Sequence, residues 1–273
     1  MEFLLLREIV LLVALGIAAY TDWKTGYIYD WISYPLIAIG GILSVVEFST
    51  YGIWPFAVAA IVFGIGYLFY YFGKLGGGDV KLFAGVALIL PLYNGTLYVI
   101  PLLFYSALAA STVLGVYYGI SYYRKGIDWK LNQSGVRRAT LLGAAFLLYF
   151  VLAAYYNVFP LYLLTAIIIP ILIGLVFVAF EQGIRKEFFL KEIPLQKAEE
   201  DEILELDKLS KSAFKALKGK TLLDGKEKKA LQKMGIEKIW VYRNLPKFAP
   251  FILLAALLLF AFPQFAQIFT LVG

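Results

Sequence analysis

Residues 54–83 read WPFAVAAIVFGIGYLFYYFGKLGGGDVKLF, an apolar run that ends in a polar, glycine-rich turn and a single aspartate, Asp79. An uncharged stretch of this length is typical of a transmembrane helix. Asp79 lies where the apolar run stops, and an ionisable residue at a membrane boundary is a candidate for function. Asp22 occupies the same kind of position after the first apolar run. We therefore expect Asp22 and Asp79 to carry the chemistry of a membrane protein.

The composition indicates a membrane protein and narrows the chemistry. Hydrophobic residues make up 61% of the 273 residues, charged residues 16%, and the mean hydropathy is +0.77, which is not typical of soluble domains. The chain contains no cysteine and no histidine. This excludes a cysteine nucleophile, a Ser-His-Asp triad and a zinc site built from Cys or His. A hydrolase made from these residues must use carboxylates, Lys or a Ser/Lys pair, and we expect neither a metal nor a cofactor.

Eight apolar windows predict an all-α polytopic membrane protein with about eight transmembrane helices, or six to eight if short segments are re-entrant. The windows cover about 3–20, 31–47, 54–72, 80–93, 98–122, 139–157, 160–180 and 249–270. If eight spans alternate, one side receives 24 of the 25 Lys and Arg residues, with Arg7 as the exception. The positive-inside rule makes that side the cytoplasm. Asp22 and Asp79 are then both expected at the cytoplasmic face of the cell membrane.

Residues 181–248 interrupt the membrane pattern with a segment rich in Lys and Glu. Residues 226–234 are typical of a helix that Gly235 ends, and residues 239–242 are typical of a strand. The segment is too long for a simple loop, so we expect a small cytoplasmic α/β insertion. The predicted organisation is a transmembrane catalytic bundle over 1–180, the insertion over 181–248 and a C-terminal transmembrane helix over 249–273.

Two carboxyl groups suffice to hydrolyse a peptide bond if one is ionised and the other protonated. Asp22 and Asp79 share a face and a depth, which is the necessary condition. Gly76 to Gly78 remove side-chain bulk and permit a positive φ, so that a substrate main chain can pass close to Asp79. Two simpler interpretations stay open. Asp79 can be the N-cap of the helix that follows, and Asp22 can belong to a polar interfacial turn anchored by Lys24.

Together the two segments resemble the prepilin and preflagellin leader peptidases, aspartic proteases of the GxGD class. Members of that family carry Asp after the first span, basic residues two and four positions on, and then Ile-Pro-Asn/Asp. In this chain Asp22, Lys24, Ile28 and Asp30 fit, whereas Gly26 and Tyr29 depart from the pattern. The second motif, Gly-x-Gly-Asp followed by a hydrophobic residue and Lys, is matched by Gly76, Gly78, Asp79, Val80 and Lys81. Residues 221–260 look like the C-terminal part of the archaeal members.

The resemblance implies an aspartic endopeptidase that removes short basic leader peptides from type IV pilin-like or archaellin precursors. Asp22 and Asp79 would be catalytic, and supporting or substrate-binding roles would fall to Gly76, Gly78, Lys81, Lys24 and Asp30. The implied partners are a prepilin or prearchaellin substrate and membrane lipids, with no nucleic acid. The N-methyltransferase activity of bifunctional bacterial relatives is unsupported, because their cysteine-rich insertion is absent from this cysteine-free chain.

Two other functional classes are alternatives. The first is an intramembrane protease of the presenilin or signal-peptide-peptidase type, because Tyr29-Asp30 is similar to their Tyr-Asp motif. However, this dipeptide lies outside a predicted span, and no Pro-Ala-Leu motif is present. The second is a transporter that uses Asp22 and Asp79 as proton or cation sites. Such a protein should hold further charges at mid-depth in its spans, whereas Glu47 lies only at the outer end of one.

Overall fold

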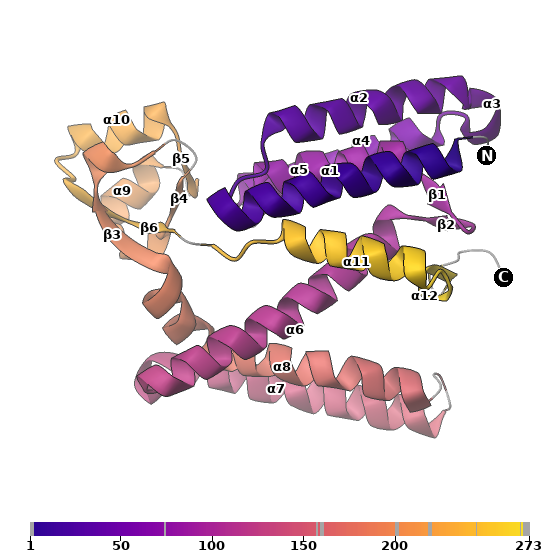
Figure 1. Cartoon of the computed structure of the whole chain (residues 1–273). Helices are drawn as coiled ribbons and strands as arrows, with labels where there is room; N and C mark the ends of the chain where they lie inside the picture. Colours follow the sequence, from indigo (N-terminus) through magenta and orange to yellow (C-terminus); the bar gives the residue numbers. More distant parts are fainter. Residues whose placement is uncertain are drawn as a thin grey trace. The chain divides into compact units, whose positions relative to one another are not determined.

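The computed structural model describes residues 3–73, 75–156, 158, 161–199, 202–217, 220–243, 245–267 and 269. It contains two compact units. Unit 1 comprises Met1–Ala107 and Glu192–Gly273, and unit 2 comprises Leu108–Lys191. Figure 1 shows the course of the chain and its helices and strands. The boundaries that the sequence predicts at residues 180 and 248 stay a prediction.

Each of the eight apolar windows overlaps a helix. These helices are α1 (Leu4–Thr25), α2 (Asp30–Val46), α4 (Trp54–Tyr71), α5 (Gly77–Ile89), α6 (Val99–Lys125), α7 (Trp129–Tyr155), α8 (Leu161–Ile184) and α11 (Ala249–Ala261). Of these, α5 and α11 end before their windows do. Within the described residues, five segments are long and apolar enough to cross a membrane: α1, α4, α6, α7, and Ile168–Phe189, which joins the end of α8 to the π-helical turn η1 (Arg185–Phe189). The predicted class, a helical polytopic membrane protein with a small α/β insertion, is confirmed, and the number of spans is left open.

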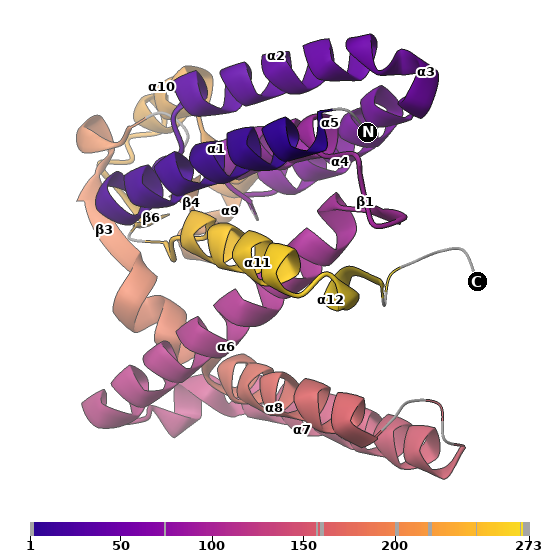
Figure 2. The ribbon, with the colours of Figure 1, turned by 45° about the vertical axis from the view of Figure 1, so that its right-hand side comes forward.

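In unit 1, α5 is the central helix of the bundle. It packs against α2 on one side and α4 on another, while α1 packs against α11 and α2 (Figures 1 and 2). From Val80 to Ile89 every residue of α5 is buried except Lys81. This burial explains why α5 lacks a polar face, because a helix surrounded by neighbours is apolar all round. α5 therefore holds Asp79 at the start of a rigid, enclosed element.

Short elements close the bundle at the far end of α5. The four-residue helix α3 (Phe48–Tyr51) follows α2, and a hairpin of β1 (Leu92–Tyr93) and β2 (Thr96–Leu97) follows α5. Asn94 and Gly95 both have positive φ angles, as a tight two-residue hairpin turn of the I′ type requires. The one-turn helix α12 (Gln264–Gln267) comes after α11.

The insertion is a folded α/β element with its own apolar core. Its four-stranded sheet has the order β3 (Leu190–Pro194), β6 (Lys238–Tyr242), β4 (Glu202–Leu204) and β5 (Leu222–Leu223). β4 is antiparallel to both of its neighbours. The helices α9 (Lys211–Ala216) and α10 (Gly225–Lys233) and the short 3₁₀ turns η2 (Leu195–Lys197) and η3 (Leu206–Lys208) complete it. The helix and strand that the sequence predicts here are confirmed as α10 and β6, and Gly235, at φ 71°, follows α10 as expected.

In unit 2, α7 and α8 form a closely packed pair held by a buried amide. The Oδ1 atom of Asn132 accepts a hydrogen bond from the main-chain nitrogen of Gly183 (2.9 Å), and its Nδ2 donates to the Tyr122 hydroxyl (2.8 Å). Gly135 lies so near the Ala179 carbonyl oxygen that a Cβ would come within 2.5 Å of it. Small residues at such a contact let two membrane helices approach closely.

Candidate active site

Asp22 lies on the last turn of α1, which ends at Thr25 and is followed by Gly26 in a left-handed conformation. The side chain is buried, with 7% of its surface exposed. Its Oδ2 accepts a hydrogen bond of 2.9 Å from the main-chain nitrogen of Ala249, the first residue of α11. The N-terminus of α11 has no side-chain cap of its own, so Asp22 supplies the acceptor that this helix end needs.

Asp79 lies in the first turn of α5, at the third helical position. The N-cap is Gly76, so the interpretation of Asp79 as the N-cap is wrong. The Gly76 main chain forms a hydrogen bond to the Asp79 carboxyl group. The other oxygen, Oδ1, is shielded from solvent and has no hydrogen-bond partner in the described part of the chain. A buried oxygen without a partner costs free energy, which makes it a candidate for binding a proton, water or substrate.

Asp22 and Asp79 lie 57 positions apart in the sequence, and the structure brings them together from two helices, α1 and α5. Asp22 is close enough for its charge to act on the Asp79 carboxyl group. Each carboxyl group lies at the N-terminus of a helix, α11 for Asp22 and α5 for Asp79. The positive end of a helix dipole favours negative charge. The arrangement therefore suits a pair of carboxyl groups that hold one negative charge and one proton between them.

The three glycines before Asp79 serve packing within the chain. None of them has a positive φ, so the conformational freedom that the sequence allows here is not used. A Cβ on Gly76 would lie 2.8 Å from Asp79 Oδ2, and one on Gly78 would lie 2.9 Å from both the Cβ and the carbonyl oxygen of Ile28. A Cβ on Gly77 would lie 3.3 Å from the Tyr70 ring. The space that Gly76 and Gly78 leave is filled by the Asp79 carboxyl group and by the segment after Asp22.

Lys81 and Asp30 connect the two sequence motifs. Lys81 Nζ lies 2.5 Å from Asp30 Oδ1 and 5.1 Å from the centre of the Tyr34 ring. Both partners of this ion pair are partly exposed, so it contributes little stability, on the order of 0.2–1 kcal/mol for such pairs. Lys24 is exposed and interacts with Tyr20, with 3.3 Å between Nζ and the hydroxyl oxygen. Lys81 and Asp30 thus join α5 to α2, whereas Lys24 contacts its own helix.

Two features of unit 1, one at the site and one at the opposite end of α5, were not predicted from the sequence. The first is the start of α11, where Ala249 binds Asp22 and the Lys247 Nζ donates to the carbonyl oxygen of Trp23 (2.6 Å). The second is a buried ion pair of Arg7 and Glu47, with 2.9 Å between Nη2 and Oε2. Glu47 directly follows the end of α2, as the sequence predicts, and it is buried against Arg7 in the first turn of α1. Among the described residues, no cluster of three or more acidic side chains could hold a metal ion.

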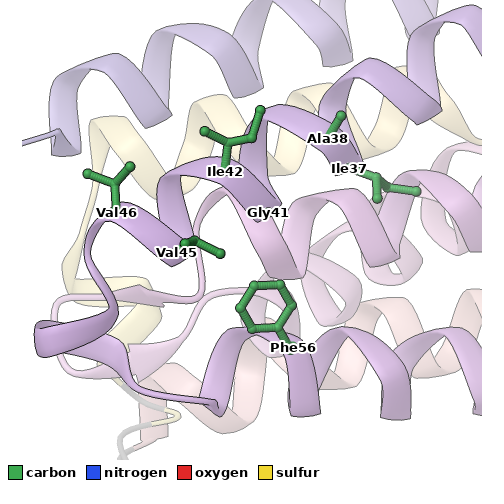
Figure 3. Close-up of a pocket in the computed structure, with 7 residues that line it drawn as sticks. All are labelled: Ile37, Ala38, Gly41, Ile42, Val45, Val46 and Phe56. Atoms are coloured by element: carbon green, nitrogen blue, oxygen red, sulfur yellow. The ribbon is translucent and has the colours of Figure 1, made fainter.

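A shallow apolar groove of about 450 Å³ lies between α2 and α4, away from the two aspartates (Figure 3). Its lining residues are Ile37, Ala38, Gly41, Ile42, Val45, Val46 and Phe56. The groove begins seven residues into α2 and continues toward the end of that helix, whereas Asp30, at the start of α2, binds Lys81 beside Asp79. Its lining residues include no ionisable group that could act as an acid or a base.

Comparison with known proteins supports the resemblance over the segment that carries both aspartates. Residues 9–120 match the model of the type IV leader peptidase family. The chain is also similar to the prepilin peptidase EppA of the archaeon Methanothermobacter thermautotrophicus, with 34% identity over 95 residues, which is 32% of this chain and 24% of that protein. The matched region thus covers about a quarter of the curated relative. No solved structure matches the chain. The matched residues 9–120, which include Asp22, Asp30, Asp79 and Lys81, are thus similar to the type IV leader peptidase family.

Proposed function

We propose that this protein is a membrane aspartic endopeptidase that cleaves short basic leader peptides from type IV pilin-like or archaellin precursors at the cytoplasmic face of the membrane. The observation that carries the proposal is the approach of the Asp22 and Asp79 carboxyl groups at the ends of two helices. The family match over residues 9–120 supports the same reaction class.

The chemistry needs one ionised and one protonated carboxyl group. The ionised group takes a proton from water while the water oxygen attacks the carbonyl carbon of the scissile bond. The protonated group donates its proton to the carbonyl oxygen. When the tetrahedral gem-diol intermediate collapses, the C–N bond breaks and the protonated base gives its proton to the leaving amine. One hydroxyl of the intermediate returns its proton to the other carboxylate as the C=O bond forms, so the pair again holds one proton. Water is consumed and no covalent enzyme intermediate forms.

Hydrogen bonding suggests which aspartate plays which part. Asp22 Oδ2 accepts from the main-chain nitrogen of Ala249, and such a bond favours an ionised carboxylate. Asp79 Oδ1 is buried without a partner in the described part of the chain, which suits a carboxyl group that carries the proton. We infer that Asp22 is the base that activates water and that Asp79 is the acid that protonates the carbonyl oxygen.

The charge of the substrate fits this placement. A leader with Lys or Arg before the cut is held at the cytoplasmic surface by anionic lipids, while the apolar segment after the cut stays in the bilayer. The scissile bond would then lie at the depth of Asp22 and Asp79.

The experiment is cleavage of a leader-bearing substrate by the purified full chain in liposomes, with the products identified by mass spectrometry. A single cut between the basic leader and the apolar segment is expected. Replacing the basic residues of the leader with Glu should slow the cut. Absence of cleavage, or a cut inside the apolar segment, would contradict the proposed function. Equal rates for basic and acidic leaders would contradict the positioning of the substrate by charge.

A further inference from the structure

A buried group of polar side chains surrounds the end of α5 opposite Asp79. Arg7 of α1 is fully buried, and its Nε and Nη2 both lie 2.9 Å from Glu47 Oε2. Its Nη1 donates to the carbonyl oxygens of Ile89 (2.8 Å) and Leu88 (3.3 Å), which are the last two residues of α5. The Tyr51 ring lies 5.3 Å from the guanidinium carbon. Arg7 therefore joins α1, the end of α2 and the end of α5.

α2 approaches the same end of α5 along one face. The Ser44 hydroxyl donates to the Leu88 carbonyl oxygen at 3.1 Å. A Cβ on Gly40 would lie 2.6 Å from the Ile89 nitrogen, so the two main chains are in direct contact there. Positions 40, 44 and 47 have the spacing of one helix face. Arg7, Ser44 and Glu47 are called the α5 clamp below.

The length of α5 explains why a clamp is needed. Its 13 residues span about 20 Å, whereas the hydrocarbon core of a bilayer is about 30 Å thick. If Asp79 lies at one membrane face, the last carbonyl groups of α5 lie inside the hydrocarbon region. Unpaired carbonyl groups are not tolerated at that depth unless protein groups bind them. A cation at a helix C-terminus also interacts favourably with the helix dipole.

We propose that the α5 clamp sets the position of α5 along its axis and so holds the Asp79 carboxyl group in register with Asp22. Arg7, Ser44 and Glu47 are then positioning residues, because they touch neither the substrate nor the reacting atoms. They act through the rigid, enclosed helix that joins Leu88 and Ile89 to Asp79. The inference rests on the proposed function, since it concerns the geometry of the proposed catalytic pair.

The test compares variants of the full chain in liposomes by kcat, KM and melting temperature. Arg7→Lys keeps a charge opposite Glu47 but loses the planar fork that reaches Glu47 and two carbonyl groups together. We expect normal insertion, a KM within about twofold of wild type, and a kcat lower on the order of tenfold, as displacement of a reacting group by a fraction of an ångström produces. Ser44→Ala removes one hydrogen bond and should lower kcat less.

A matched control separates positioning from loss of charge on α1. Glu8→Gln neutralises the neighbouring residue, which forms no ion pair in the part of the chain that the structure describes, and should leave kcat and KM unchanged. If Arg7→Lys does not fold, the double variant Arg7→Met/Glu47→Met removes both buried charges, which is commonly tolerated, and should still have a reduced kcat. If neither folds, Ser44→Ala decides.

The results that would overturn the inference are distinct from failure of the proposed function. The inference is overturned if folded Arg7→Lys or the folded double variant has the kcat of the wild type. If only Ser44→Ala folds, a wild-type kcat in that variant overturns the inference. A lower melting temperature with an unchanged kcat would also overturn it, because that marks a structural role alone. Failure of the wild-type protein to cleave any leader would instead refute the proposed function.

Discussion

Gly76→Ala should impair the Asp79 carboxyl group without unfolding the protein. Gly76 has φ −71° and ψ 142°, a conformation that any residue adopts, so alanine introduces no backbone strain. Its Cβ would lie 2.8 Å from Asp79 Oδ2, whereas ordinary contact begins at 3.4 Å, so the carboxyl oxygen must move by about 0.6 Å. The atom that moves is the end of a side chain, and the fold should therefore be nearly unchanged.

The catalytic loss follows from the size of this displacement. Misplacing a reacting group by 1 Å costs about a hundredfold in rate, so a shift of about 0.6 Å should lower kcat roughly tenfold. KM should change little, because Gly76 fills no space that a substrate needs. The assay is kcat and KM for cleavage of a leader-bearing substrate in liposomes, with the melting temperature measured in parallel.

Two glycine variants are controls. Gly64→Ala, in α4, meets no atom within 4 Å and should stabilise the helix by about 0.5–1 kcal/mol with unchanged kcat. Gly77→Ala meets the Tyr70 ring at 3.3 Å, which can shift, and should affect kcat less than Gly76→Ala does. A Gly76→Ala variant with the kcat of the wild type would refute the reasoning that this glycine positions the Asp79 carboxyl group, the proposed catalytic acid.

Two further predictions concern topology and the insertion. Cysteines introduced by Thr25→Cys and Ser134→Cys into this cysteine-free chain should react with a membrane-impermeant reagent only from the cytoplasmic side, and Thr50→Cys only from outside; labelling of Thr25→Cys from outside would invert the orientation. The Asp224 side chain caps α10 by accepting hydrogen bonds from the main-chain nitrogens of Lys226 and Glu227. Asp224→Ala should therefore make the insertion easier to cleave by proteases. The hydrogen bond from Lys220 lowers the pKa of Asp224 below its usual 3.8, so the ionised Asp224 stabilises the insertion above that pH. The difference in protease sensitivity between Asp224→Ala and the wild type should therefore shrink as the pH falls below about 3.8. A difference in protease sensitivity that persists unchanged would refute this role.

The helices of the bundle were predictable because a membrane helix is recognised in a sequence by its length and its apolar composition. The window at 80–93 is displaced from α5, Gly77–Ile89, because apolar residues continue past Leu90 into the hairpin around Asn94-Gly95. Composition alone does not distinguish an apolar helix from an apolar strand of two residues. The dipeptide Asn94-Gly95 was the local signal for that turn.

The partners of the site were harder to predict than its aspartates. Asp22 accepts a hydrogen bond from the main-chain nitrogen of Ala249, 227 residues away. Because every residue except proline has such a nitrogen, the identity of Ala249 does not indicate this contact. Arg7 was visible as the one cation expected outside the cytoplasm, but its pairing with Glu47 depends on how α1, α2 and α5 pack. Side-chain identity shows which groups are expensive to bury, and only the fold shows which groups offset that cost.

The most direct test of the paired-carboxyl mechanism is the cleavage rate of the Asp22→Asn and Asp79→Asn variants. Asparagine keeps the shape of each side chain but can neither take nor hold the proton that the pair shares. Each variant should insert normally and leave a leader-bearing substrate intact, while Asp30→Asn, which loses only the partly exposed ion pair with Lys81, should retain substantial activity. Cleavage by either Asp22→Asn or Asp79→Asn at a rate near that of the wild-type protein would contradict the account.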